Sequence, residues 1–195
     1  MLYNIKTIIK TWEEQFSKNW NNLSTKVKDF WWRWFSQLVT NNLRGILAEY
    51  IVASDIGITE KTREERDAYD LITPENIKIE IKSASYIQSR EQKKLSSISF
   101  SIRPTYWYST ETNKREETKK RQSDIYIFCL LAHKNQETLN PLEMNQRDFY
   151  ILPTKILEYK IPKQKTISLQ KLEKIWAIKT CYGEIYNTIK LLYKN

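Results

Sequence analysis

Apolar and polar residues alternate strictly from Ile77 to Lys82, and this period of two predicts a β-strand. The three isoleucines of the run would lie on one face of the strand. Glu80 and Lys82 would share the opposite face with Lys78. The pattern therefore predicts a strand with one buried face and one face that carries a carboxylate beside an amine.

A shorter strand is predicted at residues 68–72, and the turn-forming residues 73–76 separate it from the strand at 77–82. An antiparallel hairpin is the economical arrangement. If its loop has three residues, Asp70 falls opposite Glu80 with Cβ atoms roughly 5 Å apart. A shift of one residue would turn Asp70 to the wrong face. Two carboxylates this close would raise each other's pKa unless a cation lies between them, so we expect a metal ion there.

A helix is predicted before the hairpin, at residues 43–53. Its apolar residues recur at the spacing of one helical face, from Leu43 to Ile51. Glu49 lies off this apolar stripe and could reach a site at the edge of the helix–sheet packing. It could equally be an ordinary solvated glutamate.

The rest of the chain predicts one central strand and several shorter elements. Residues 123–132 are almost continuously apolar, which is typical of a strand covered on both faces. Residues 97–102 alternate, and we expect them to form the third strand of the core sheet. Residues 104–121 lack an apolar period and are expected to form a loop. The other predicted elements are a strand at 148–153 and helices at 154–159, 168–172 and 182–193.

Residues 1–40 are expected to form a helical extension packed on a core domain of residues 41–195, in a single compact arrangement. Two helices are predicted between Tyr3 and Val39, the second beginning near Ser24. This segment is rich in aromatic residues. They could cap the core, form a dimer surface or stack on bases.

Composition narrows the classes of chemistry. The 195 residues carry a formal net charge of +9, which fits a polyanionic partner, although lysine-rich surfaces also occur on proteins that bind none. His133 is the single histidine, which excludes catalytic sites built on paired histidines. Only three glycines are present and no glycine-rich phosphate loop exists, which excludes kinase and motor chemistry. The chemistry must depend on carboxylates, lysines and a metal ion.

Two further features concern the compartment. Cys129 and Cys181 lack the spacing of a redox or zinc motif and indicate a reducing environment. Apolar runs are far shorter than the roughly 18 residues that a membrane span requires, and nothing resembles a signal peptide. We expect a cytoplasmic protein with no membrane partner.

The spacing Asp70, nine residues, Glu80-Ile81-Lys82 resembles the active-site signature of the PD-(D/E)XK nuclease superfamily. The resemblance covers roughly residues 41–153. It implies an α/β fold with a restriction-endonuclease-like core, in which helices flank a central mixed β-sheet. Members often have proline before the aspartate, where this chain has Tyr69.

The resemblance also implies a catalytic set of Asp70, Glu80, Lys82 and Glu49. Its metal ligands would be Asp70, Glu80, Ile81 and Glu49, with Mg²⁺ as the cofactor and Mn²⁺ able to substitute. The implied activity is a metal-dependent DNA endonuclease that hydrolyses phosphodiester bonds, of a restriction type, with RNA not excluded. A homodimer is expected because double-strand cutting usually needs two sites.

Basic, aromatic and polar residues after the hairpin are expected to contact nucleic acid, although the basic loop could also be a solvated connection. The expected contacts are Ser83, Ser85, Gln88, Arg103, Trp107, Lys114, Arg115, Lys119, Lys120 and Arg121. Two alternatives stay open. The chain could be an inactive nuclease-fold subunit that binds nucleic acid, or a protein-interaction module.

Overall fold

The structure is a computed structural model that describes residues 9–59, 69–106, 108–109, 114–115 and 117–193, and for residues 108–115 it describes the backbone pairing alone. The chain divides into two compact units, residues 1–38 and residues 39–195. The expected packing of residues 1–40 on the core stays a prediction. No helix in the described ranges is both long enough and apolar enough to span a membrane.

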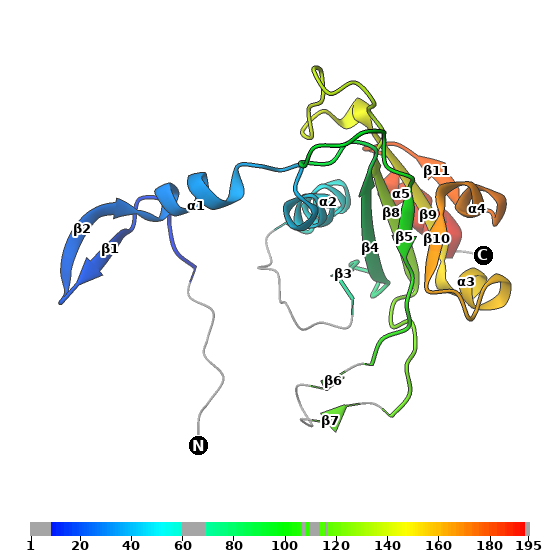
Figure 1. The fold of residues 1–195 in the computed structure, drawn as a ribbon. Coiled ribbons are helices and arrows are strands. Elements are labelled where there is room, and N and C mark those ends of the chain that lie inside the picture. Colours follow the sequence, from blue (N-terminus) through cyan, green and yellow to red (C-terminus); the bar gives the residue numbers. More distant parts are fainter. Residues whose placement is uncertain (1–8, 60–68, 107, 110–113, 116, 194–195) are drawn as a thin grey trace. The chain divides into compact units, whose positions relative to one another are not determined.

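The second unit is built on a mixed sheet of five strands in the order β11-β9-β8-β4-β3 (Figure 1). β4 and β8 pair in parallel, and the other neighbours in the sheet are antiparallel. These strands are β3 (Leu71–Ile72), β4 (Lys78–Ser85), β8 (Ile125–Leu131), β9 (Arg147–Pro153) and β11 (Ile178–Thr180). The predicted α/β class with a central mixed sheet flanked by helices is confirmed.

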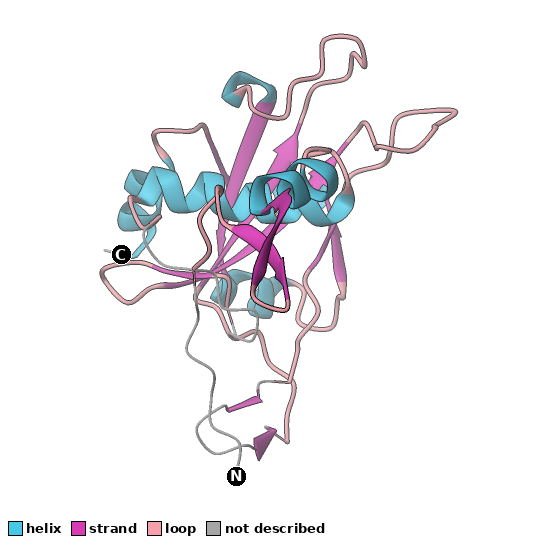
Figure 2. Ribbon diagram, turned by 90° about the vertical axis from the view of Figure 1, so that its left-hand side faces the viewer, coloured by secondary structure: helices cyan, strands magenta, loops and turns pink. Residues whose placement is uncertain are grey.

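Each face of the sheet is covered by its own apolar layer. Helices α2 (Asn41–Ile56) and α5 (Ile185–Tyr193) pack on one face. Figure 2 is viewed from the side on which α2 lies, so that this long helix crosses in front of the sheet. The opposite face packs against α3 (Thr154–Lys160), α4 (Leu169–Lys174) and the pair β5 (Ser99–Ser101) and β10 (Thr166–Ser168). A 3₁₀ turn, Met144–Gln146, precedes β9.

β8 lies in the middle of the sheet, and all seven of its residues are buried. Because both faces of this strand are covered, its side chains alternate between the two apolar layers. Ile127 and Cys129 belong to the layer under α2, whereas Tyr126 and Phe128 belong to the other layer. The nearly unbroken apolar run correctly predicted this central strand.

The hairpin of β3 and β4 has the predicted register. Leu71 pairs with Ile79 and Ile72 pairs with Lys78, and the ladder ends there, so Asp70 lies one residue before β3 begins. The Asp70 N–H donates to the carbonyl of Ile79 at 2.9 Å, so the backbone stays close to β4 at Asp70 but departs from the regular ladder there. The isoleucines of β4 are buried, as their alternation predicted. β3 is shorter than expected and β4 runs further, to Ser85.

Two predictions about the segment after β4 are corrected. β5 pairs with β10 in a separate two-stranded sheet and is not the third strand of the core sheet. Phe100 of β5 packs against Phe128 of β8. β5 therefore lies over a face of the core sheet rather than beside one of its edge strands. Residues 104–121 are not a plain loop, because β6 (Tyr108–Ser109) pairs with β7 (Lys114–Arg115) and Thr105 bridges Lys120. Backbone pairing of this kind needs no apolar period.

The first unit contains a hairpin and one helix. The hairpin consists of β1 (Gln15–Lys18) and β2 (Asn21–Lys26), and α1 (Val27–Phe35) follows it. The predicted first helix is therefore wrong where the structure describes it. Asn19 and Trp20 both have positive φ, the requirement of a two-residue hairpin turn, and a helical apolar period does not reveal this turn. The second predicted helix is confirmed in shorter form, and none of its residues is buried within the unit.

Candidate functional site

Glu80 and Lys82 lie on the same face of β4 because they are two residues apart in a strand. Their side chains form an ion pair in which the Lys82 ammonium group donates to a Glu80 carboxylate oxygen. Only 21% of the Glu80 side chain and 29% of the Lys82 side chain are exposed. The pair is therefore less screened by water than an ordinary surface ion pair.

Asp70 approaches this pair from the residue immediately before β3. One of its carboxylate oxygens accepts a hydrogen bond of 2.6 Å from the backbone N–H of Ile81. β3 pairs only with the first residues of β4, so the N–H of Ile81 faces the open edge of the sheet and the Asp70 side chain satisfies it. Asp70 consequently has a structural task besides any role in binding. Ile81, which was expected among the metal ligands, offers its N–H to Asp70 in this structure.

The carboxylates of the site act on one another. Burial raises the pKa of Glu80 above its ordinary value of 4.5, and the nearby charges of Asp70 and Glu49 raise it further. Lys82 acts in the opposite direction by stabilising the charged form of Glu80. Helix α2 thus brings Glu49 close enough to influence Glu80 electrostatically. Asp70 and Glu49 therefore act on Glu80 as negative charges, and the Lys82 ammonium group lies beside it.

The donor chemistry of these residues fits a hard divalent cation. Among the residues that the structure describes, no group of three or more histidine, cysteine, aspartate or glutamate side chains is arranged to hold a metal ion. Mg²⁺, however, is usually held by one or two carboxylates together with substrate phosphates and water. Asp70 and Glu80 supply such a pair, and a cation would relieve the repulsion that raises the Glu80 pKa.

The residues that were expected to contact nucleic acid fall into three groups. Two of them are buried in structural roles. The Ser85 hydroxyl donates to the carbonyl of Ile87 at 2.7 Å, and Arg121 is 8% exposed and donates to the carbonyls of Ile102 and Gln164. Their polar groups are occupied by backbone carbonyls inside the fold, although Ser85 also borders the pocket at the end of β4.

A second group lies at or near the surface. Arg103, Lys119 and Lys120 are exposed, and the Lys119 ammonium group lies 4.9 Å from the centre of the Tyr106 ring. These cations could meet a phosphate backbone. Trp107 lies outside the described residues, as do the side chains of Lys114 and Arg115.

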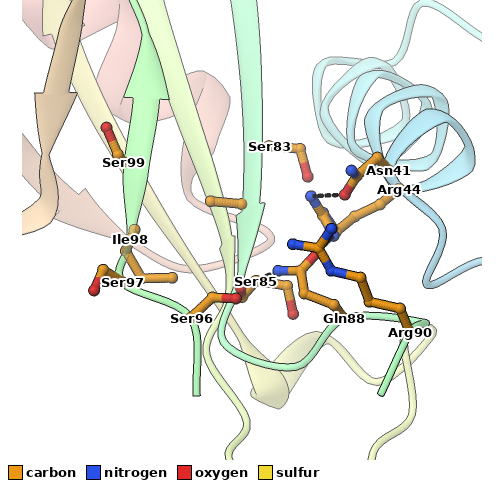
Figure 3. A pocket seen from close by; sticks show the side chains of 11 residues that line it. Asn41, Arg44, Ser83, Ser85, Gln88, Arg90, Ser96, Ser97, Ile98 and Ser99 are labelled. Atoms are coloured by element: carbon orange, nitrogen blue, oxygen red, sulfur yellow. Dashed lines mark hydrogen bonds between the residues drawn. The ribbon is translucent and has the colours of Figure 1, made fainter. Parts of the chain in front are cut away.

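Ser83 and Gln88 form the third group, because they line a pocket at the end of β4 (Figure 3). The pocket also contains Arg44 of α2 and Arg90 of the loop after β4, which the sequence analysis did not single out. One signal was present in the sequence. Arg44 lies in the first turn of a helix, where a cation opposes the helix dipole, and such a position calls for another explanation.

Comparison with known proteins bears on the identity of the chain. The family model described as Bacteriophage T4 endonuclease IV matches residues 11–171, which is more than half of the chain. The matched range contains Glu49, Asp70, Glu80 and Lys82. No curated protein and no solved structure matches the chain. The chain therefore belongs to the bacteriophage T4 endonuclease IV family, a family of nucleases.

Proposed function

We propose that this protein is a metal-dependent DNA endonuclease of the PD-(D/E)XK type, with its active site on β4 beside the start of β3. One observation carries the proposal: Asp70 is held by the Ile81 N–H where its charge acts on Glu80, and Glu80 is paired with Lys82 on the same strand face. Membership of an endonuclease family supports a nuclease activity. The net charge of +9 suits a DNA substrate.

Asp70 and Glu80 would hold a divalent cation, Mg²⁺ or Mn²⁺, through their carboxylate oxygens. When bound, such a cation supplies positive charge to a phosphodiester and favours ionisation of a coordinated water. The Ile81 N–H fixes one Asp70 oxygen, so the carboxylate is already oriented before substrate arrives. Glu49 would complete the acidic set from α2, at the position from which it already acts on Glu80.

Lys82 is proposed to orient the attacking water and to stabilise the negative charge that develops on the phosphate oxygens. Its ammonium group is held by Glu80 and partly shielded from solvent, which limits its conformational freedom. In the reaction, the water oxygen forms the new bond to phosphorus, the bond from phosphorus to the leaving oxygen breaks, and a proton ends on that oxygen. The Lys82 ammonium group would donate a hydrogen bond to the attacking water or to a phosphate oxygen, the proton that the water loses would pass to solvent, and the leaving oxygen would take its proton from solvent.

The test is cleavage of plasmid and branched DNA by Asp70→Asn, Glu80→Gln and Lys82→Met proteins, with Mg²⁺ or Mn²⁺ and with EDTA. We expect cleavage by the unmodified protein to require the metal and each substitution to lower the rate by at least about 10²-fold. Lys78→Met is the matched control, since it removes a lysine from the same face of β4, two residues before Glu80. That protein should retain nearly full activity.

Full activity in the Lys82→Met protein, or undiminished cleavage in EDTA, would refute the proposed mechanism. DNA binding without cleavage under all these conditions would instead favour an inactive binding subunit. The expected homodimer, the restriction type and the choice between DNA and RNA stay predictions. Cleavage assays on RNA with the same sequence as the DNA substrate would distinguish a DNA-specific from an RNA-cleaving nuclease.

A further inference from the structure

A small pocket lies at the carboxyl end of β4, beyond the Glu80–Lys82 pair. Its walls come from the first turn of α2, the end of β4, the loop after β4 and the segment that leads into β5 (Figure 3). The volume is about 220 Å³, below the usual range for whole drug-sized ligands, so it suits a small chemical group. The side chains that line it include two arginines, five serines and two amides, and no carboxylate.

Arg44 is the central cation of this pocket. It is only 7% exposed, and its guanidinium group donates to the side-chain oxygens of Gln88 at 3.2 Å and Asn41 at 3.0 Å. Within the described ranges no carboxylate forms an ion pair with it, and its Nε–H has no hydrogen-bond partner. Burial lowers the pKa of this guanidinium, because its charge is removed from water and its acceptors, which include the Val39 carbonyl at 3.4 Å, are neutral. An uncompensated buried cation calls for an anion.

Further positive charge gathers around Arg44. Arg90 lines the same pocket from the loop after β4, and in Figure 3 its side chain points toward the guanidinium of Arg44. Arg147 is 3% exposed, and the charge of Arg44 helps to lower the pKa of Arg147. Like charges in such proximity destabilise the fold unless an opposite charge is bound between them.

Neutral donors complete the arrangement. The Ser83 hydroxyl is buried in the pocket wall and has no hydrogen-bond partner among the residues that the structure describes. The first turn of α2 borders the pocket, and its N-cap residue Thr40 makes no side-chain capping bond. A helix start of this kind favours an anion through its free N–H groups and its dipole. The residues that line the pocket thus supply hydrogen-bond donors and positive charge, and none of them is a carboxylate. This is the environment that a phosphate group requires.

We propose that this pocket binds one phosphate group of the DNA strand that is cut at the Glu80–Lys82 site. This inference rests on the function proposed above. Lys82 and Ser85 are three residues apart on β4, a separation of about 10 Å along the strand. Phosphates of one DNA strand follow each other about every 3.4 Å along the helix axis, so the bound phosphate lies within about three nucleotides of the scissile bond.

The first test compares Arg90→Gln with Lys93→Gln, each made in the Lys82→Met protein so that DNA binding is measured without cleavage. Both residues are exposed and lie in the loop after β4, and both substitutions remove one positive charge, but only Arg90 lines the pocket. We expect Arg90→Gln to weaken binding about tenfold or more and to reduce the slope of log K against log salt by about 0.7 to 0.9. Lys93→Gln should change both quantities less.

The second test locates the phosphate. Neutral methylphosphonates are placed one at a time within three nucleotides of the cleavage point, and a parallel pair of oligonucleotides carries either a 5′-phosphate or a 5′-hydroxyl end. Neutralising or removing the bound phosphate should weaken DNA binding to the Lys82→Met protein. The same DNA modification should not weaken binding further when Arg90→Gln is also present. An internal position identifies a backbone phosphate, whereas sensitivity to the 5′ end identifies a terminal phosphate, and either result supports the pocket.

Arg44→Lys is the second variant, because removing the buried charge outright risks unfolding. Lysine keeps the charge but loses the flat fork of donors, so we expect weaker DNA binding with the melting temperature nearly retained. If Arg90→Gln and Lys93→Gln weaken DNA binding equally, and no phosphate modification near the cleavage point weakens it, the proposed phosphate pocket is refuted. The proposed nuclease function would be unaffected by that result. Absence of DNA binding by the parent protein at low salt would overturn the proposed function and the pocket together.

Discussion

Replacing Asp70 separates its structural role from its chemical role. Asp70→Ala removes the acceptor of the 2.6 Å hydrogen bond from the Ile81 N–H, and that donor is left partly buried without a partner. Leaving such a group unsatisfied costs about 1–3 kcal/mol of unfolding free energy. Asp70→Asn keeps an oxygen at the same place and should cost much less. Both substitutions remove the charge that raises the Glu80 pKa, so this effect cancels when the two are compared.

For a chain of this length, 1 kcal/mol corresponds to about 2–4 °C in melting temperature, so Asp70→Ala should melt about 2–12 °C below Asp70→Asn. Thermal unfolding without divalent cations, followed by circular dichroism, measures the difference. Both proteins should have lost cleavage activity. Glu91→Ala, which removes an exposed carboxylate from the loop after β4, is the control and should melt with the unmodified protein. Equal melting temperatures for the two Asp70 variants would refute the structural role of this hydrogen bond.

Three further predictions concern the site and the thiols. Lys82→Met should lower the rate of DNA cleavage by about 10²- to 10⁴-fold while Lys78→Met leaves it nearly unchanged, as initial rates with Mg²⁺ would show. Burial raises the pKa of Glu80 above 4.5, so the folded metal-free protein binds more protons than the unfolded protein. The free energy of unfolding should therefore fall, relative to that of Glu80→Gln, as the pH rises from about 4.5 through the raised pKa. Urea unfolding across that range checks the sign, and a constant difference would contradict it. Burial raises the pKa of the Cys129 thiol to about 12 whereas Cys181 is exposed, so a thiol reagent should modify Cys181 in the native protein and Cys129 only after denaturation.

The strands of the core were the most predictable part of the fold. An apolar run of this length at residues 123–132 has few alternatives to a central strand, and the alternation at 77–82 specified which side chains are buried. The hairpin register followed from the loop length, because a slip of one residue would bury charges and expose isoleucines. These predictions hold because each depends on neighbours in the sequence.

The failures share a different cause. The turn at Asn19 and Trp20 depends on two backbone angles that an apolar pattern does not report, so a hairpin was predicted as a helix. The third alternating segment was assigned to the core sheet because alternation predicts a strand but does not identify its partner. β5 instead pairs with β10, a strand more than sixty residues later in the chain.

The candidate site likewise contains one part that the sequence predicted and one part that only the tertiary structure revealed. The spacing of Asp70, Glu80 and Lys82 was visible in the sequence, because the period of a strand and the length of one loop decide which of these residues face each other. The pocket around Arg44 was not visible. It forms only when the first turn of a helix meets the end of a strand forty residues later, and the exposure and partners of a guanidinium depend on that contact. Local periodicity decided the acidic pair and its lysine, whereas long-range packing alone decided that a buried arginine would lie at the end of the same strand, with no carboxylate paired to it among the described residues.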